Sequence, residues 1–300
     1  MSEGYEALRH GAAWMDLAAR GRIVVRGRDR ARLLHAITSN EVKKMTPGTG
    51  CYAFLLSPQG RIQADLNLFC FEDRFLIDTE PEVRENVYRH IKRYIIADQV
   101  ELEDVVQQTG AIGLEGPGAA AVLASLSAPI PGADYSHLEW DLAGKPAGAT
   151  IAAVTLTGQP GFRIYCAAEN VADTVRRLES AGAKPATSED ARLVRIENGK
   201  PRYGEDIRET SLVQETQQMH AVSFTKGCYL GQEIVERVRA QGHVNKKLMR
   251  VELDGSEPLA AGAKTTVDGA EAEITSSVFS PASGRVVALA YVRNARQKSI

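Results

Sequence analysis

The chain has 300 residues, of which 44% are hydrophobic and 25% are charged, the balance of an ordinary globular protein with a sizeable core. Its 36 basic and 38 acidic residues give a formal charge of −2, which excludes a bulk field that would draw it to nucleic acid or an anionic membrane. The N-terminus is too polar for a secretory signal and no apolar run approaches about 18 residues, so we expect a cytoplasmic protein outside the membrane. The four cysteines show no zinc-ligand spacing, which predicts free thiols and no metal site.

The first third of the chain predicts a meander of antiparallel strands covered by helices. Strands are expected at residues 22–27, 51–56, 61–72 and 73–79, and helices at 28–38 and 81–96. Between two of these strands, Pro58 and Gly60 occupy the second and fourth positions of a type I turn. Pro81 begins the second helix, where its missing N–H costs least.

The remainder of the chain continues the α+β pattern and then changes. An apolar stretch at 110–116 leads into the alanine-rich segment 117–126, residues 149–167 predict a hairpin, and 169–182 predict an amphipathic helix that ends on Gly182. A helix at 187–199 begins with Thr187 and Asp190 in capping-box spacing. After Gly242 short strands and turns follow, which predicts a module over 1–242 and a small β-barrel over 243–300.

The strand "RIQADLNLFCF" predicts one polar-aromatic face. Alternation places Ile62, Ala64, Leu66, Leu68 and Cys70 toward the core, and Gln63, Asp65, Asn67, Phe69 and Phe71 on the other side. Polar groups beside aromatic rings suit a flat heteroaromatic ligand, with Asp65 accepting hydrogen bonds from its N–H groups. The alternative is a face half covered by another lobe.

The stretch "KGCYLGQE" places a cysteine between a glycine turn and the amphipathic run "IVERVRA". Cationic neighbours and helix N-terminal amides lower the pKa of a thiol, so Lys226 and the following helix predict a reactive Cys228. The alternative is a small packed residue at a helix start. A Cys–His dyad is weakly supported because His220 and His243 would have to fold back.

Two charged stretches complete the candidates. In residues 195–207, Arg195 and Glu197 lie two positions apart and therefore point to different faces of a helix, so that one can face inward while the other stays at the surface. A basic run lies at the boundary of the two modules, and a solvated helix face explains it most simply; contact with a ligand's carboxylate tail or with RNA is the alternative. Its members are Arg237, Arg239, His243, Lys246, Lys247 and Arg250.

These stretches together resemble the YgfZ-type folate-binding proteins, relatives of the glycine-cleavage T-protein (aminomethyltransferase). "KGCYLGQE" resembles the YgfZ signature, and "LEGPGAAAVL", "RIENGKPRYGEDI" and "FSPASGRVVALAYV" extend the resemblance over nearly the whole chain. The resemblance implies interwoven antiparallel α+β lobes in a ring around a central folate-binding hole, with a small C-terminal β-barrel beside it.

The same resemblance assigns site residues. Asp65 matches the aspartate that lies at the reactive nitrogens of the folate, and Phe69 takes a slot next to the pterin. Arg195 and Glu197 match a segment near the ligand, and Asn67 shares the face of Asp65. The YgfZ motif is matched by Lys226, Cys228, Gln232 and Glu233.

Two positions depart from the T-protein pattern. Ala64 replaces the first aspartate of a pair, and "TGQPGFRIY" places Gln159 and Arg163 where a T-protein has glutamates. A guanidinium has no acceptor, so Arg163 cannot replace a carboxylate that binds the amino-pyrimidine edge of a pterin. Arg163 would instead meet a carbonyl or a tail carboxylate.

The sequence therefore predicts a folate-binding protein of YgfZ type that takes tetrahydrofolate or a one-carbon derivative and supports iron–sulfur protein assembly or repair. Its expected partners are folate and iron–sulfur proteins or assembly factors, with no membrane and no nucleic acid. Asp65, Lys226 and Cys228 would be the catalytic residues. An aminomethyltransferase and a non-enzymatic, folate-stabilised binding module are the alternatives, so catalysis itself stays open.

Overall fold

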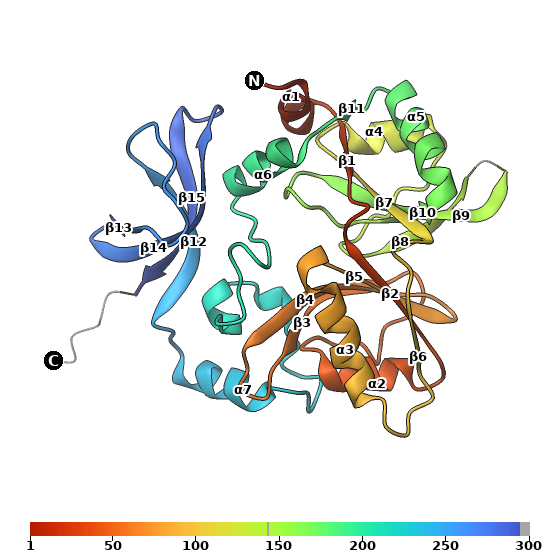
Figure 1. Cartoon of the computed structure of the whole chain (residues 1–300), viewed down its shortest axis with the longest axis horizontal. Coiled ribbons are helices and arrows are strands. Elements are labelled where there is room, and N and C mark those ends of the chain that lie inside the picture. Colours follow the sequence, from red (N-terminus) through yellow and green to blue (C-terminus); the bar gives the residue numbers. More distant parts are fainter. Residues whose placement is uncertain (143, 295–300) are drawn as a thin grey trace.

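The computed structural model describes residues 1–142 and 144–294 as a mixed α+β fold with three sheets (Figure 1). The first sheet is antiparallel, with the strand order β3-β4-β5-β2-β6. Helices α2 (Arg30–Ile37) and α3 (Arg84–Tyr94) pack against it. Its strands are β2 (Gly21–Arg26), β3 (Gly50–Leu56), β4 (Ile62–Cys70), β5 (Arg74–Thr79) and β6 (Glu101–Asp104).

The two faces of β4 belong to two different cores, as its alternation predicts. Residues 62, 64, 66, 68 and 70 are buried in the core that includes α2 and α3. Phe69 and Phe71 are buried in a second core, which joins this sheet to the next lobe. The face that carries Asp65 and Asn67 is therefore directed toward the other lobe.

The second sheet has the order β11-β1-β7-β10-β9-β8. Helices α4 (Ala119–Ser125) and α5 (Val171–Ser180) contribute to the core on one of its sides. Strand β1 belongs to this sheet although β2, the next strand in the sequence, belongs to the first, so the two lobes are interwoven. The strands are β1 (Ala13–Asp16), β7 (Thr109–Glu115), β8 (His137–Leu142), β9 (Lys145–Ala152), β10 (Gly161–Ala167) and β11 (Lys184–Pro185).

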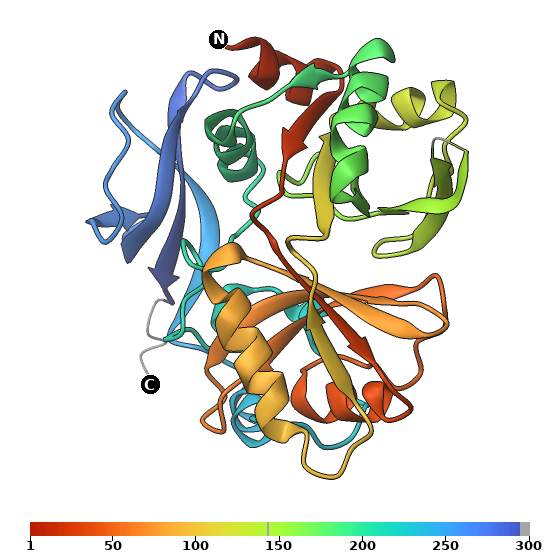
Figure 2. The same ribbon diagram turned by 45° about the vertical axis from the view of Figure 1, so that its right-hand side comes forward.

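The third sheet is C-terminal, antiparallel and ordered β12-β15-β14-β13. It lies beside α6 (Ser188–Glu197), which packs between this sheet and α1 (Glu3–His10) (Figure 2). Strands β12 and β13 are not paired with each other within the described residues, so the sheet is curled and open rather than a closed barrel. Its strands are β12 (Lys246–Leu253), β13 (Lys264–Val267), β14 (Ala270–Ser280) and β15 (Arg285–Arg293).

Short segments connect these parts. In the described part of the chain there are four short 3-10 turns, η1 (Pro81–Val83), η2 (Ala168–Asn170), η3 (Val213–Thr216) and η4 (Met219–Ala221), and helix α7 (Gln232–Gln241) precedes the third sheet. None of the helices within 1–142 and 144–294 combines the length and the apolar character needed to cross a membrane.

Most of the predicted elements are confirmed, including the hairpin of β9 and β10 and the capping box at Thr187 and Asp190. Helix α1 and strand β1 were not predicted from the sequence, because eight mostly polar residues and a four-residue strand carry little periodicity. Ser2 nevertheless caps α1 by accepting from the N–H of Tyr5. The prediction of a C-terminal barrel is wrong in its closure, and its β character is confirmed.

Candidate functional site

A cavity of about 60 Å³ lies where the first and second sheets face each other. The first sheet contributes polar side chains from β3 and β4, and the second contributes Arg163 from β10. Residues 195–202 and 218–220 close it from the third side. The lining residues are Arg20, Tyr52, Asp65, Asn67, Glu80, Tyr135, Val154, Thr155, Leu156, Arg163, Arg195, Lys200, Pro201, Arg202, Gln218 and His220.

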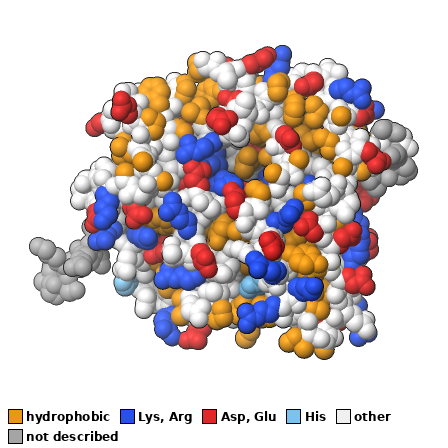
Figure 3. All heavy atoms as spheres, viewed as in Figure 1, with side chains coloured by type: hydrophobic (Ala, Val, Ile, Leu, Met, Phe, Trp, Pro, Cys, Tyr) orange, Lys and Arg blue, Asp and Glu red, His pale blue; other side chains and the backbone are white. Residues whose placement is uncertain are grey.

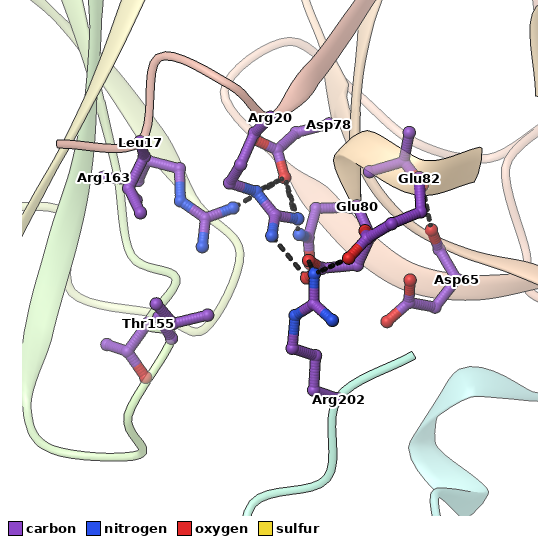
Figure 4. A network of polar contacts seen from close by, with 12 residues as sticks. Leu17, Arg20, Asp65, Asp78, Glu80, Glu82, Thr155, Arg163 and Arg202 are labelled. Atoms are coloured by element: carbon purple, nitrogen blue, oxygen red, sulfur yellow. Dashed lines mark hydrogen bonds and ion pairs between the residues drawn. The ribbon is translucent and has the colours of Figure 1, made fainter. Parts of the chain in front are cut away.

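Asp78 is the centre of the polar network beneath this cavity (Figure 4). Its Oδ1 lies 2.6 Å from both Arg20 Nη2 and Arg163 Nη1, and its Oδ2 accepts from the hydroxyl of Tyr165 at 3.0 Å. The register pairs Asn67 of β4 with Asp78 of β5, and Asn67 donates to Asp78 at 3.1 Å. Since Arg163 belongs to β10, this fully buried ion pair joins the two sheets.

The charges around Asp78 decide its ionisation. Burial alone would raise the pKa of Asp78, but the guanidinium groups of Arg163 and Arg20 outweigh it and lower the pKa to about 2. Arg20 also pairs with Glu80, which in turn lies 2.8 Å from Arg202 (Figure 4). Asp78 and Glu80 are thus committed to arginines and are not available to a ligand.

Asp65 differs from these two carboxylates. Its Oδ2 accepts from the hydroxyl of Tyr52 at 2.9 Å, and its Oδ1 is buried without any hydrogen-bond partner. Among the described residues no Lys, Arg or His forms an ion pair with it, although it lines the cavity. Burial, and then the charge of Glu80, raise the pKa of Asp65 to about 6. An unsatisfied buried acceptor facing a cavity is a group that can bind a donor from a ligand.

Aromatic rings form the wall next to Asp65. Tyr52 stacks on His220 with ring centroids 5.2 Å apart, and Tyr135 lies 6.4 Å from Tyr52 in a similar plane. Such a wall suits the flat face of a heterocycle.

Lys200 is a lining residue that the sequence analysis missed. Its Nζ donates to the carbonyl oxygen of Thr155 and, at 3.1 Å, to the hydroxyl of the same residue. Burial lowers the pKa of Lys200 to about 8, against the opposing charge of Glu115. The residue lies inside the stretch 195–207 that the sequence analysis singled out, but a loop lysine gives no sign of burial.

Some of the predicted ligand-binding residues line the cavity and others do not. Asp65, Asn67, Arg163 and Arg195 line the cavity, and the guanidinium of Arg195 is held by Asp206 and Glu205.

Phe69 and Glu197 do not line it, and a contact of either residue with the ligand stays a prediction. Phe69 is packed between His137 and Tyr165, with centroids 5.7 and 5.8 Å away, because the second lobe covers this end of β4. Glu197 accepts from the hydroxyl groups of Tyr5 and Ser280. Arg195 and Glu197 are not paired with each other, and both are buried rather than one of them exposed.

The cysteine motif lies away from this cavity. Cys228 is exposed, whereas Cys70 and Cys166 are buried and Cys51 is half-buried, and Cys228 is not among the lining residues. Gly227 has a φ of +90°, which the turn before Cys228 requires. Three residues separate Cys228 from the start of α7, so the thiol is not in the first turn of that helix.

The ammonium of Lys226, which was expected to act on the thiol of Cys228, is bound to backbone carbonyls instead. Its ammonium donates to the backbone carbonyls of His35, Thr38 and Asn40, all at 2.6 Å, and these lie at and beyond the end of α2. Burial lowers the pKa of Lys226 to about 8. The lysine therefore fixes the loop to α2.

The other two motif residues act within α7 and its approach. The side-chain oxygen of Gln232 accepts from the N–H of Tyr229 at 3.3 Å, and Glu233 pairs with Arg237 at 2.7 Å on the exposed face of the helix. This pair and that of Arg239 with Glu236 confirm the basic run as a solvated helix face here. Basic and acidic side chains are likewise interspersed over the face shown in Figure 3.

A second cavity of about 320 Å³ adjoins the first, because Leu156, Arg195 and Arg202 line both. Its walls are mostly apolar and include Met15 and Leu17.

Comparison with known proteins agrees with this architecture. The model of the family described as "GCVT N-terminal domain" matches residues 1–226. An aminomethyltransferase of Rubrobacter xylanophilus is 30% identical over 96% of this chain and 78% of its own length. A protein of Arabidopsis thaliana whose name describes it as a chloroplastic transferase is 27% identical over 89% of this chain, which spans only 62% of that relative. The glycine cleavage system aminomethyltransferase T from Bartonella henselae has the same fold, with a TM-score of 0.86, 20% identity, and coverage of 97% of this chain and 81% of that one.

Proposed function

Because the chain belongs to the GCVT N-terminal domain family, we propose that it binds tetrahydrofolate or a one-carbon derivative in the first cavity and acts as a one-carbon transferase of aminomethyltransferase type. The names of its relatives, including the aminomethyltransferases of Rubrobacter xylanophilus and Thermus thermophilus, support this choice. A central hole within a ring of lobes, and the division into a 1–242 folate-binding module and a 243–300 domain, belong to the same proposal.

One observation carries the proposal, namely the buried and unpartnered Oδ1 of Asp65. Tetrahydrofolate offers N–H donors on its pterin and ring nitrogens that carry the one-carbon unit. Asp65 would accept from such a donor, and a carboxyl group with a pKa near 6 exchanges a proton readily at neutral pH. Asn67 and the wall of Tyr52, Tyr135 and His220 would orient the ring.

The network of Asp78 explains how the site differs from that of a T-protein. Arg163 is bound to Asp78, so the amino-pyrimidine edge of a pterin is not recognised from position 163. We expect partly exposed lining residues such as Arg202 to adjust their side chains when the ligand enters.

A second candidate function rests on Cys228, the exposed one of the four cysteines. A YgfZ-type role in iron–sulfur protein assembly or repair would use this thiol toward a partner protein, outside the cavity. A non-enzymatic module, in which folate only stabilises the fold, is the third possibility. The cytoplasmic location stays a prediction.

Calorimetric titration with tetrahydrofolate tests the proposal. We expect saturable binding by the wild type and a loss of at least about 1 kcal/mol in Asp65→Ala, because a hydrogen bond to a charged group is removed. Asp254→Ala is the control, since its side chain is 97% exposed. Equal affinity in wild type and Asp65→Ala would remove Asp65 from the site.

Transfer assays then separate the candidates. An aminomethyltransferase moves the methylene carbon of an aminomethylated dihydrolipoyl carrier protein to two nitrogens of tetrahydrofolate, with release of ammonia and of the carrier's free thiol. Asp65→Ala should abolish this release of ammonia. A YgfZ-type protein would bind folate without this reaction, and its effect on iron–sulfur enzyme activity would depend on Cys228.

A further inference from the structure

We propose that Lys200 is a specificity-determining residue of the cavity, and that its ammonium donates a hydrogen bond to an oxygen atom of the ligand that Asp65 contacts. The identity of that ligand as a reduced folate rests on the proposed function. The oxygen is either the carbonyl oxygen of the pterin or a carboxylate oxygen of the glutamate tail.

Nearly all of the charged side chains that line the cavity are already paired. Arg20 and Arg163 are bound to Asp78, and Arg20 also to Glu80. Arg202 is bound to Glu80 and Glu82, and Arg195 to Glu205 and Asp206. Among the described lining residues, this leaves one cation and one anion without an ionic partner, Lys200 and Asp65.

Lys200 is held in position by its backbone and side chain. Its N–H donates to the carbonyl of Arg195 at 3.0 Å, and Pro201 follows it. An ammonium group has three N–H donors, and Thr155 accepts from Nζ through its carbonyl and its hydroxyl. One N–H of the Lys200 ammonium therefore remains without an acceptor among the described residues. Among them, no carboxylate oxygen lies within 4.0 Å of Nζ of Lys200, the distance that defines an ion pair.

Lys200 and Asp65 do not satisfy each other, since no ion pair joins them. A partly buried charge without an ionic partner is costly, so two of opposite sign at one cavity fit a ligand that supplies both partners. Such a ligand presents an N–H donor to Asp65 and an oxygen acceptor to Lys200. A pterin and its tail contain both kinds of group.

Arg163 is the competing donor, because its Nε is also buried without a partner. Its Nη1 is fixed on Asp78 at 2.6 Å, and the ion pair fixes the plane of the guanidinium. Lys200 has no ionic partner, so a ligand oxygen can still pair with its charge. A test that changes only Lys200 separates the two donors.

The experiment measures calorimetric affinities of three probes for four proteins. The probes are tetrahydrofolate, its 4-amino analogue, in which an amine replaces the pterin oxygen, and tetrahydropteroate, which lacks the glutamate. The proteins are wild type, Lys200→Met, Lys200→Arg and the control Lys44→Met, whose side chain is 81% exposed. We expect Lys200→Met to bind tetrahydrofolate about 10- to 100-fold more weakly, the range for a hydrogen bond to a charged group. Lys200→Arg should recover part of this loss, and Lys44→Met should equal the wild type.

The probes identify the oxygen. If Lys200 meets the pterin carbonyl, the wild type discriminates against the 4-amino analogue and Lys200→Met does not. If Lys200 binds the carboxylate of the glutamate tail, the wild type discriminates against tetrahydropteroate and Lys200→Met does not. Lys200→Met that binds tetrahydrofolate within about twofold of wild type, and keeps both preferences, overturns the inference while the proposed function stands. A wild type that binds none of the probes overturns the proposed function and this inference together.

A second measurement on the wild type avoids the risk that a variant misfolds. Acetylation by an N-hydroxysuccinimide ester, followed residue by residue with mass spectrometry, should be slowed at Lys200 by saturating tetrahydrofolate and unchanged at Lys44. Labelling of Lys200 that saturating ligand leaves unchanged contradicts the contact.

Discussion

Replacing Asp65 by Asn should make the free protein more stable, although it should weaken ligand binding. Asp65 carries a negative charge at neutral pH with no cationic partner among the described residues and with a buried, unpartnered Oδ1. Asn keeps an acceptor for the hydroxyl of Tyr52 and removes the charge. Functional sites commonly hold such unfavourable groups at a cost in stability.

The magnitude follows from the pKa of Asp65. Burial raises it from 3.8 to about 6, so the ionised form costs up to about 3 kcal/mol, since a tenfold change in an equilibrium constant is worth about 1.4 kcal/mol. The new amide N–H groups lack an acceptor, so we expect a net gain of about 1–2 kcal/mol.

The sign of the pH dependence is fixed by the same pKa. Between about pH 4 and 6 the folded state binds more protons at Asp65 than the unfolded state does, so wild-type stability falls as pH rises through this window. The variant lacks this loss. Its advantage should therefore be complete above pH 6 and absent below pH 4.

Urea unfolding at pH 7.5 and pH 4 tests this expectation. Asp78→Asn serves as a comparison, because it should lower the free energy of unfolding where Asp65→Asn should raise it. Asp78 is paired with two buried arginines, so its neutralisation should cost about 3–5 kcal/mol at pH 7.5. Asp254→Asn, on the surface, should change the free energy of unfolding by less than about 1 kcal/mol. The reasoning fails if Asp65→Asn is less stable than wild type at pH 7.5, or if its advantage persists at pH 4.

Three further outcomes are expected. In competitive alkylation with mass-spectrometric readout, Cys228 should react fastest of the four cysteines. Cys228 is exposed, whereas burial raises the pKa of Cys51 to about 12 and also raises the pKa values of Cys70 and Cys166. Equal rates at the four cysteines would contradict this. Lys226→Met should lower the free energy of unfolding by about 1–3 kcal/mol, because three backbone carbonyls lose their donor, and the loss would be missing if water replaces the ammonium. Asp206→Ala should lower the free energy of unfolding in urea by about 3–5 kcal/mol, because Arg195 loses one carboxylate partner and the hydroxyls of Thr275 and Ser276 in β14 lose their acceptor. A loss below about 1 kcal/mol would show that other contacts hold the third sheet.

The sequence was sufficient to place Asp65 on the side of β4 that faces the other lobe, and the reason is geometric. Strand alternation is a local property, so it separated the core side of β4 from the side that carries Asp65 and Asn67. It could not distinguish Asp65 from Phe69 on the same side, because the second lobe covers one end of that face and leaves the other open.

Residues whose role depends on distant partners were not predictable in this way. The guanidinium of Arg163 is bound by Asp78, 85 positions earlier in the chain, and no local pattern announces that pair. Lys200 follows the end of α6 in a charged loop that reads as solvated, although the carbonyl of Thr155 holds it at the cavity. The motif around Cys228 predicted a reactive thiol, and its reactivity stays a prediction. The thiol is exposed, but the lysine two residues earlier donates to carbonyls at the end of α2.

The crystal structure of the protein with tetrahydrofolate tests the central claim most directly. We predict that the pterin lies between the first and second sheets, against Tyr52 and Tyr135, with a ring N–H about 3 Å from Oδ1 of Asp65. A folate bound elsewhere, beside Cys228 or on the third sheet, or a pterin with no donor within hydrogen-bond distance of Asp65, would contradict the account.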